Sequence, residues 1–245
     1  DNCPDIVILA AAKVGGIFAN KNNPSKFILD NLKIQTNLIE ISNYFKVKKF
    51  LFLGSSCIYP RLATQPITEK DLLSGQLEIT NEFYAIAKIA GIKLCQALAI
   101  QRGFNSICLM PTNLYGPGDN YHKSDSHVLP SLIKKFSEAK NKNMKNVTCW
   151  GDGSPLREFL YVDDLAEACI FAIENLSLNS KYYPKDKNGK PLFWINVGSN
   201  QEISIKNLAG MIAKLVGYEG SIIWDKTMPN GTPRKKLDTS VLDKL

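Results

Sequence analysis

A tyrosine and a lysine in the first half of the chain have a spacing that suits shared chemistry. Tyr84 and Lys88 enclose three residues in the sequence Tyr-Ala-Ile-Ala-Lys. On a helix they project from one face, one turn apart. An ammonium at that distance favours the phenolate, which makes the phenol a better proton donor to a carbonyl that receives a hydride. The same spacing also occurs in ordinary surface pairs, so a second observation is needed.

The loop that contains Ser55 supplies that observation. Ser55 lies in the sequence Gly-Ser-Ser-Cys, directly after the apolar run 50–53. In a parallel sheet the ligand crevice lies beyond the carboxyl ends of the strands, so Ser55 could hydrogen-bond the carbonyl oxygen that Tyr84 protonates. Cys57 follows two residues later, and in an extended segment it would point to the same side as Ser55. The combination predicts a site that reduces a carbonyl group.

Two kinds of segment alternate around these residues. Short apolar runs at 6–10, 50–53 and 106–110 are typical of strands that are buried on both faces. Apolar residues at helical spacing predict helices over 25–45 and 82–100. Strands that alternate with helices pair in parallel through right-handed crossovers. The predicted fold class is therefore α/β, with a doubly wound, Rossmann-type parallel sheet.

The second half of the chain predicts a smaller α/β lobe that binds the substrate. Helices are expected over 128–140, after Asp163-Asp164 and over 204–216, and strands over 147–150 and 194–197. We place a boundary near residue 117. Residues 1–117 then form the dinucleotide-binding domain, and 118–245 form mainly the substrate lobe, with part of 157–200 returning to the sheet.

The chain carries no G-x-G-x-x-G sequence, although doubly wound nucleotide folds normally begin with a strand, a Gly-rich turn and a helix. It opens on the run 6–10 and stops within an apparent helix start at 239–245. We therefore expect a fragment that lacks the Gly-rich turn and the C-terminal end. Because that turn normally holds the pyrophosphate, we expect this segment alone to bind a dinucleotide weakly and to fold poorly.

Composition indicates a globular protein that binds a small ligand. Hydrophobic residues make up 44% and charged residues 22%, which argues against disorder. The net charge of +7 is scattered, which suits a phosphate-rich small molecule better than nucleic acid. No apolar run of about 20 residues and no signal peptide is visible, so we expect a cytoplasmic protein without a membrane span. Six cysteines without a C-x-x-C pair indicate buried thiols and no metal site.

Longer stretches extend the argument to a family. Ser55, Tyr84 and Lys88 resemble the catalytic triad of the extended short-chain dehydrogenases/reductases. Stretches over nearly the whole chain closely resemble the GDP-L-fucose synthases: 10–16, 54–60, 81–91, 110–117, 126–130, 150–153 and 157–160. The resemblance implies NADP(H) as cofactor and a GDP-sugar as substrate. It implies that GDP-4-keto-6-deoxy-D-mannose is epimerised at C3 and C5, and that the 4-keto group is then reduced to give GDP-L-fucose.

The same resemblance assigns residues to roles. Cys57 and His127 are implied as the acid and base of the epimerisation, beside the catalytic Ser55, Tyr84 and Lys88. The loop 12–16 is expected to pass the ribose and phosphates of the cofactor. The residues implied to contact the cofactor are Leu53, Gly54, Ser55, Ser56, Lys88, Pro111, Thr112, Asn113, Leu114 and His127. Those implied to bind the substrate are Lys135, Trp150 and Arg157.

Structural roles stand beside these assignments. Cys57 could be a buried thiol in a loop, His127 a cap of the following helix, Lys135 a solvated helix residue, Trp150 a core residue and Arg157 part of a structural ion pair. Asn230 occupies a position where the family often has Asp, which puts in doubt any hydrogen bond that needs a carboxylate there.

Other functions are also compatible with the superfamily. A UDP-sugar 4-epimerase has no use for an acid–base pair at the α-carbons, and dehydratases typically carry Asp-Glu where Ser56 and Cys57 stand. A non-catalytic dinucleotide-fold fragment is a further alternative. Helices 25–45 and 82–100 carry apolar or small side chains on more than one face, so we expect a homodimer with a four-helix interface. The preference for NADP over NAD or for GDP over another nucleotide, and the base at each carbon, are not readable from the residues.

Overall fold

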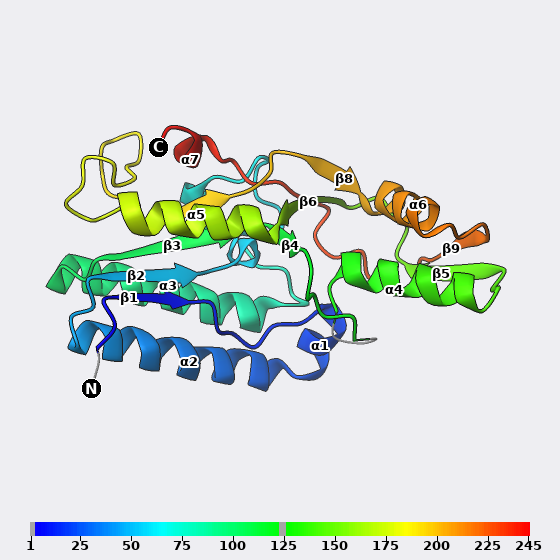
Figure 1. The fold of residues 1–245 in the computed structure, drawn as a ribbon, viewed down its shortest axis with the longest axis horizontal. Helices are drawn as coiled ribbons and strands as arrows, with labels where there is room; N and C mark the ends of the chain where they lie inside the picture. Colours follow the sequence, from blue (N-terminus) through cyan, green and yellow to red (C-terminus); the bar gives the residue numbers. More distant parts are fainter. Residues whose placement is uncertain (1–2, 123–125) are drawn as a thin grey trace.

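The computed structural model describes residues 3–122 and 126–245 and shows a layered larger part beside a smaller lobe (Figure 1). The larger part contains a parallel sheet with the strand order β1-β2-β3-β7. Its strands are β1 (Ile6–Leu9), β2 (Lys49–Leu53), β3 (Ser106–Pro111) and β7 (Trp194–Val197). Helix α2 (Pro24–Tyr44) connects β1 to β2, and α3 (Glu82–Arg102) connects β2 to β3. The predicted α/β class with a parallel sheet is confirmed.

Helices cover both faces of the central strands. Helices α2 and α3 lie side by side on one face, and α5 (Val162–Asn175) packs on β2 and β3 from the other (Figure 1). The interior residues of β2 and β3 are therefore fully buried, as expected. The same expectation is wrong for β1, where Ile6 and Ile8 are 47% and 49% exposed. The reason is its position at the edge of the described sheet, where α5 does not cover it as it covers β2 and β3.

Helix α3 is the central helix of this packing. It is the one helix of the described residues that is long and apolar enough, by length and composition, to cross a membrane. Core helices of soluble proteins satisfy the same criterion, and α3 buries Ala85, Ile92 and Cys95 within the fold. It also carries the buried Lys88 in its second turn. Its composition therefore follows from its place between α2 and the sheet.

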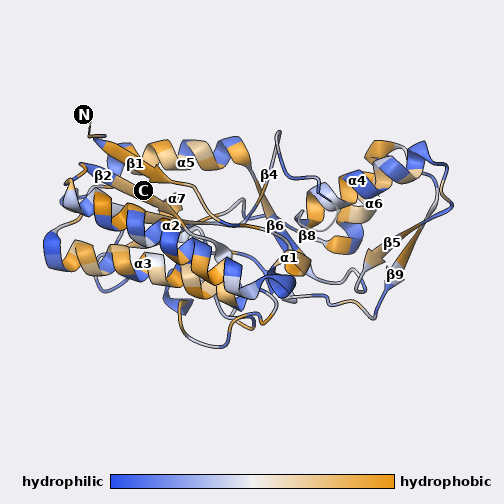
Figure 2. Cartoon of the chain, turned by 90° about the horizontal axis from the view of Figure 1, so that it is seen from below, coloured by the Kyte–Doolittle hydropathy of each residue, from blue (hydrophilic) through white to orange (hydrophobic). Residues whose placement is uncertain are grey.

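The smaller lobe has its own apolar core. It consists of α4 (Val128–Asn141), β5 (Asn146–Trp150), α6 (Ile205–Val216) and β9 (Ser221–Asp225). Strands β5 and β9 pair in parallel, and α4 packs on α6. Buried side chains fill the space between them: Leu132, Phe136, Val147, Leu208 and Ile212. The hydropathy colouring in Figure 2 shows the mixed faces of α4 and α6 in this lobe.

A third set of strands joins the two parts. Strand β6 (Leu156–Tyr161) pairs in parallel with β4 (Asn113–Tyr115) and β10 (Arg234–Lys235), and antiparallel with β8 (Glu202–Ser204). Sequence patterns did not indicate these strands. They also missed β9 and three short helical segments: α1 (Ile17–Asn22), η1 (Ser56–Ile58) and η2 (Glu69–Asp71). The helix start expected at 239–245 is present as α7 (Ser240–Asp243). The division of the chain at residue 117 stays a prediction.

A pair of helix glycines tests the packing of α3. A Cβ at Gly91 would lie 2.8 Å from Cζ of Phe52 and 2.9 Å from Cδ of Gln35, whereas a Cβ at Gly210 in α6 would meet nothing within 4 Å. We expect Gly91→Ala to lower the free energy of unfolding by about 1–3 kcal/mol through overpacking. Gly210→Ala should raise it by about 0.5–1 kcal/mol because alanine favours the helix. Denaturant unfolding of both variants of the full-length protein measures this. A stabilised Gly91→Ala variant would contradict the close packing.

Candidate active site

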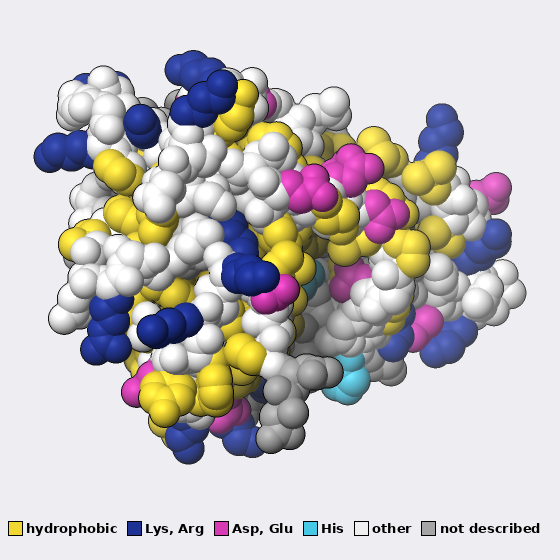
Figure 3. Space-filling view, turned by 60° about the vertical axis from the view of Figure 1, so that its left-hand side comes forward, with side chains coloured by type: hydrophobic (Ala, Val, Ile, Leu, Met, Phe, Trp, Pro, Cys, Tyr) yellow, Lys and Arg dark blue, Asp and Glu magenta, His cyan; other side chains and the backbone are white. Residues whose placement is uncertain are grey.

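A cavity of about 870 Å³ lies where the carboxyl ends of β2 and β3 meet the smaller lobe. Figure 3 shows the surface hollowed between the two parts of the molecule. The catalytic residues expected from the sequence all line this cavity: Ser55, Cys57, Tyr84, Lys88 and His127. The expected cofactor and substrate residues line it as well: Leu53, Gly54, Ser56, Pro111, Thr112, Asn113, Leu114, Lys135, Trp150 and Arg157. Side chains from both halves of the sequence thus meet in one place.

The turn after β2 differs from the expected extended segment. Ser55 has extended backbone angles, but Ser56–Ile58 form a turn of 3₁₀-helix. Ser55 Oγ accepts a hydrogen bond from the backbone N–H of Cys57 at 3.3 Å, which caps this turn. The predicted extended backbone from Ser55 to Cys57 is therefore wrong. The turn nevertheless brings both side chains to the cavity.

Tyr84 and Lys88 lie on the first two turns of α3. Lys88 Nζ donates a hydrogen bond to the carbonyl oxygen of Leu53 at 2.8 Å and lies 5.9 Å from the centre of the Tyr84 ring. Burial lowers the pKa of Lys88 to about 8. Burial, and then the charge of Cys57, raise the pKa of Tyr84 well above its ordinary value, although a hydrogen bond with Ser55 opposes them. Lys88 is not among the groups that shift this pKa, so its expected effect on Tyr84 stays a prediction, and Tyr84 is a neutral phenol.

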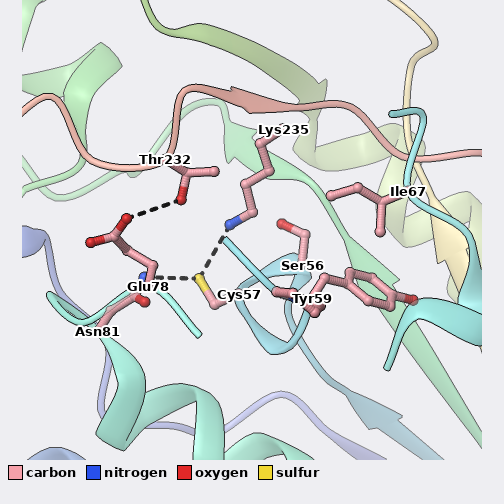
Figure 4. A pocket seen from close by; sticks show the side chains of 9 residues that line it. Ser56, Cys57, Tyr59, Ile67, Glu78, Asn81, Thr232 and Lys235 are labelled. Carbon is pink, nitrogen blue, oxygen red and sulfur yellow. Dashed lines mark hydrogen bonds between the residues drawn. The ribbon is translucent and has the colours of Figure 1, made fainter. Parts of the chain in front are cut away.

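The sulfur of Cys57 receives two nitrogen donors. Asn81 Nδ2 lies 3.3 Å from Sγ and Lys235 Nζ lies 3.4 Å from it (Figure 4). Burial by itself would raise the pKa of Cys57. The charge of Lys235, hydrogen bonds from Ser55 and Lys235, and the charge of Arg157 together bring this pKa below its ordinary value. Sequence reasoning had assigned no role to Asn81 or Lys235. Asn81 begins one of the stretches that carry the family resemblance, which was the available signal, whereas Lys235 lies outside all of them.

His127 occupies the position just before α4. Its backbone is extended, and its side chain forms no capping hydrogen bond, so the alternative role as a helix cap is wrong. Burial lowers the pKa of His127, the charge of Asp119 raises it, and the charge of Lys235 lowers it, with a net decrease. The imidazole is therefore neutral at neutral pH, a form in which one ring nitrogen accepts a proton.

The three expected substrate residues present polar and aromatic groups to the cavity. Lys135 Nζ lies 5.7 Å from the centre of the Trp150 ring and donates to the carbonyl oxygen of Thr148 at 3.3 Å. Trp150 is 42% exposed, so its alternative role as a core residue is wrong. Arg157 donates to the carbonyl oxygens of Leu156 and Asn230 at 2.8 and 3.4 Å. Within residues 3–122 and 126–245 Arg157 forms no ion pair with a carboxylate, so its charge can serve a ligand.

Asn230 has a clear structural use for its amide. Its Oδ1 accepts a hydrogen bond from the backbone N–H of Asp152 at 3.0 Å. This bond needs an acceptor oxygen but no negative charge, so the amide replaces a carboxylate here. The doubt that the sequence attached to Asn230 is removed for this contact.

The size and the unpaired polar atoms of the cavity suit a dinucleotide cofactor. Its volume falls within the roughly 300–1,000 Å³ of ligand pockets. Asn20 Oδ1 and Asn81 Oδ1 are buried and find no hydrogen-bond partner among the described residues, and both side chains line the cavity. Asn20 Nδ2 donates to the carbonyl oxygens of Gly15 and Gly16 at 2.8 and 3.1 Å, which fixes the loop before α1. A polar ligand would satisfy the two unpaired oxygens.

The low pKa of Lys88 makes a prediction about stability and pH. Because the ordinary lysine pKa of 10.5 falls to about 8 on burial, the unfolded chain binds the proton more tightly. Below pH 8 the folded protein must bury the protonated lysine, which lowers the free energy of unfolding. This loss is recovered as the pH rises toward 10.5, above which Lys88 is neutral in the folded and the unfolded chain. Relative to Lys88→Met, we expect the free energy of unfolding of the wild type to increase by about 2–3 kcal/mol between pH 7 and pH 10. Denaturant titrations at several pH values measure the difference, with the exposed Lys48→Met as control. A difference that does not change with pH would contradict a buried lysine.

Comparison with known proteins places the chain in a family. Residues 1–183 match the NAD dependent epimerase/dehydratase family. The chain is 55% identical to GDP-L-fucose synthase 1 of Arabidopsis thaliana, over 99% of this chain and 71% of that protein. It is 51% identical to GDP-L-fucose synthase of Escherichia coli, over 98% of this chain and 74% of that protein. Among solved structures, a GDP-mannoheptose C4 reductase from Campylobacter jejuni with NADP bound aligns with a TM-score of 0.83 at 32% identity, over 98% of this chain and 76% of that one. The chain therefore belongs to the NAD dependent epimerase/dehydratase family and, within it, to the GDP-L-fucose synthases.

Proposed function

We propose that this chain carries the active site of a GDP-L-fucose synthase. The reaction converts GDP-4-keto-6-deoxy-D-mannose into GDP-L-fucose by epimerisation at C3 and C5 and by NADPH-dependent reduction at C4. The observation that carries the proposal is that carbonyl-reducing side chains and an acid–base pair line one cavity: Ser55, Tyr84, Lys88, Cys57 and His127. The identity to GDP-L-fucose synthases supports the choice of substrate.

Reduction of the keto group needs a proton donor at the oxygen that gains charge. NADPH, when bound, supplies the hydride to C4, and Lys88 with the strand ends at 53–56 and 111–114 would hold it. Tyr84, whose raised pKa keeps it protonated, donates its proton to the keto oxygen. The Ser55 hydroxyl donates a hydrogen bond to the same oxygen. These two hydroxyl groups therefore select a carbonyl group as the reacting centre.

Epimerisation uses the same oxygen in a different way. When one group removes the proton from C3 or C5, the C–H bond breaks and its electron pair moves into an enolate, with the charge on the C4 oxygen. Ser55 and Tyr84 stabilise this charge by the hydrogen bonds that serve the reduction. Cys57 and His127 exchange the protons at the carbon, one removing a proton and the other returning one to the opposite face. The lowered pKa of Cys57 favours its thiolate, and the lowered pKa of His127 keeps its imidazole neutral, so either group can accept a proton.

The nucleotide end of the substrate requires positive charge and an aromatic surface. Arg157 has no carboxylate partner in the described residues, and its planar guanidinium matches a diphosphate. Lys135 and Trp150 lie next to each other on the wall formed by the smaller lobe. We assign the diphosphate to Arg157 and Lys135, and the neighbouring apolar face to Trp150.

Isotope exchange tests the two-stage reaction. The full-length protein is incubated in heavy water with GDP-4-keto-6-deoxy-D-mannose and NADPH, and the product is examined by NMR. We expect a fucose product with deuterium at C3 and C5. Cys57→Ser and His127→Gln should each slow the incorporation by about 10²–10⁴-fold, because an acid or base is lost. The buried Cys169→Ser, outside the cavity, serves as the matched control. Reduction without deuterium at these carbons would leave a plain ketoreductase and exclude the proposal.

The same proposal includes a homodimer in the cytoplasm. Apolar side chains are exposed on both helices, with exposed fractions of 37–71%. They are Leu38 and Ile41 on α2, and Phe83, Ile86 and Ile100 on α3. The two helices lie next to each other on one side of the sheet (Figure 2). A second copy of this helix pair would bury both stripes in a four-helix interface. The cysteines, all free in the described residues, are consistent with a reducing compartment.

Sedimentation tests the dimer. We expect the full-length protein to sediment as a dimer at micromolar concentration. Ile86→Glu should shift it toward the monomer, because a charge in an apolar interface is costly to desolvate. Leu215→Glu is the matched control, since Leu215 is 79% exposed on α6 in the other lobe. A wild-type protein that sediments as a monomer would refute the dimer.

A further inference from the structure

Two positively polarised nitrogens converge on the sulfur of Cys57 from different elements. Asn81 precedes α3, and Lys235 ends β10. Their nitrogens lie 3.3 and 3.4 Å from Sγ (Figure 4). An amide NH₂ and an ammonium group can only donate hydrogen bonds. The sulfur therefore accepts two hydrogen bonds, and such an environment favours a thiolate.

The fold holds Lys235 at this position. Lys235 and Arg157 are directly paired across β10 and β6, so their side chains project from the same side, and both line the cavity. The segment that follows is anchored, since the backbone N–H of Leu237 donates to Glu158 Oε2 at 2.9 Å and that of Ile67 donates to the carbonyl of Lys236 at 2.8 Å. Lys235 thus approaches Cys57 from a fixed strand.

The remaining groups around the sulfur add no unpaired negative charge to oppose Lys235. Ser55 contributes a hydroxyl, and Tyr84 is held as a neutral phenol. The carboxylate of Glu78 also lines the small cavity beside Cys57, but it is paired with Arg61 at 3.2 Å. Lys235 itself forms no ion pair with a carboxylate within residues 3–122 and 126–245. The ammonium of Lys235 is therefore free to stabilise negative charge on the sulfur.

We propose that Lys235 is a positioning residue that stabilises the thiolate of Cys57 and so prepares the sulfur to exchange protons with the substrate carbons. In that exchange a C–H bond breaks, an S–H bond forms and the electron pair moves into the enolate; the return transfer reverses these changes. The sugar chemistry rests on the proposed function, whereas the effect of Lys235 on the thiol does not. Lys235 acts through Cys57 and needs no contact with the reacting carbon.

The state of the thiol is measured without substrate. The pH dependence of Cys57 alkylation by iodoacetamide is followed by peptide mass spectrometry in the full-length protein. In Lys235→Met the midpoint should move to higher pH by about 1–3 pH units, and the rate at pH 7 should fall about tenfold or more. Lys235→Arg, which keeps the charge, should remain near the wild type. Lys236→Met is the matched control, because in the described part of the chain the donors to the sulfur are Asn81 and Lys235, and Lys236 is not one of them. A midpoint in Lys235→Met equal to that of the wild type overturns the proposal.

Isotope exchange separates this role from substrate binding. With NADP⁺ in place of NADPH, Lys235→Met should lose deuterium incorporation at C3 and C5 near pH 7 and regain it as the pH rises, while its Kd for GDP stays unchanged. Weakened GDP binding with an unshifted alkylation midpoint would make Lys235 a phosphate ligand and overturn the proposal. If the wild type shows no exchange but the midpoint moves in Lys235→Met, the proposed epimerisation fails and the role of Lys235 toward Cys57 stands.

Discussion

The hydrogen bond from Lys88 Nζ to the carbonyl oxygen of Leu53 ties α3 to the last residue of β2, and the arrangement of the site depends on it. Strand β2 pairs in parallel with β3, so their carboxyl ends open on the same side of the sheet. Helix α3 returns across this side, and its first two turns carry Tyr84 and Lys88 over the strand ends. The close approach at Gly91, which leaves no room for a Cβ beside Phe52, holds the helix at this depth.

Burial acts on the pKa values of Tyr84, Lys88 and Cys57 in the cavity, and the neighbours of each group decide the outcome. For Tyr84 and Lys88 burial dominates, so the phenol is protonated and the pKa of the lysine falls to about 8. For Cys57 two cations, Lys235 and Arg157, and a hydrogen bond from Ser55 outweigh the same burial. One cavity thus holds a protonated phenol and a thiol whose pKa is lowered. The burial of the charged Lys88 lowers the stability of the fold, as is common at functional sites.

Local patterns were sufficient to predict that Ser55, Tyr84 and Lys88 lie close together, and insufficient for the rest of the cavity. The continuous apolar runs predicted β2 and β3, and helical spacing predicted α3 with Tyr84 and Lys88 on one face. Lys235 lies on a strand of two residues and contacts a sulfur 178 positions away, so no periodicity could reveal it. The turn at Ser56–Ile58 was missed because a capping hydrogen bond from one side chain determines it. The exposure of β1 was missed because burial depends on which strands and helices lie next to it in the fold.

The two stages of the proposed reaction draw on different parts of the fold. Ser55, Tyr84 and Lys88 all come from β2, α3 and the turn between them, so the reductive set is held by one sheet and one helix. The acid–base set is divided: Cys57 belongs to that turn, His127 begins the smaller lobe at α4, and Lys235 lies on β10 beside β6. The packing of α3 on β2 therefore places the reductive set, whereas the placement of the acid–base set also depends on the strands that join the smaller lobe to the sheet. Any displacement of β10 from β6 would remove the cation from the sulfur and leave the reductive residues in place.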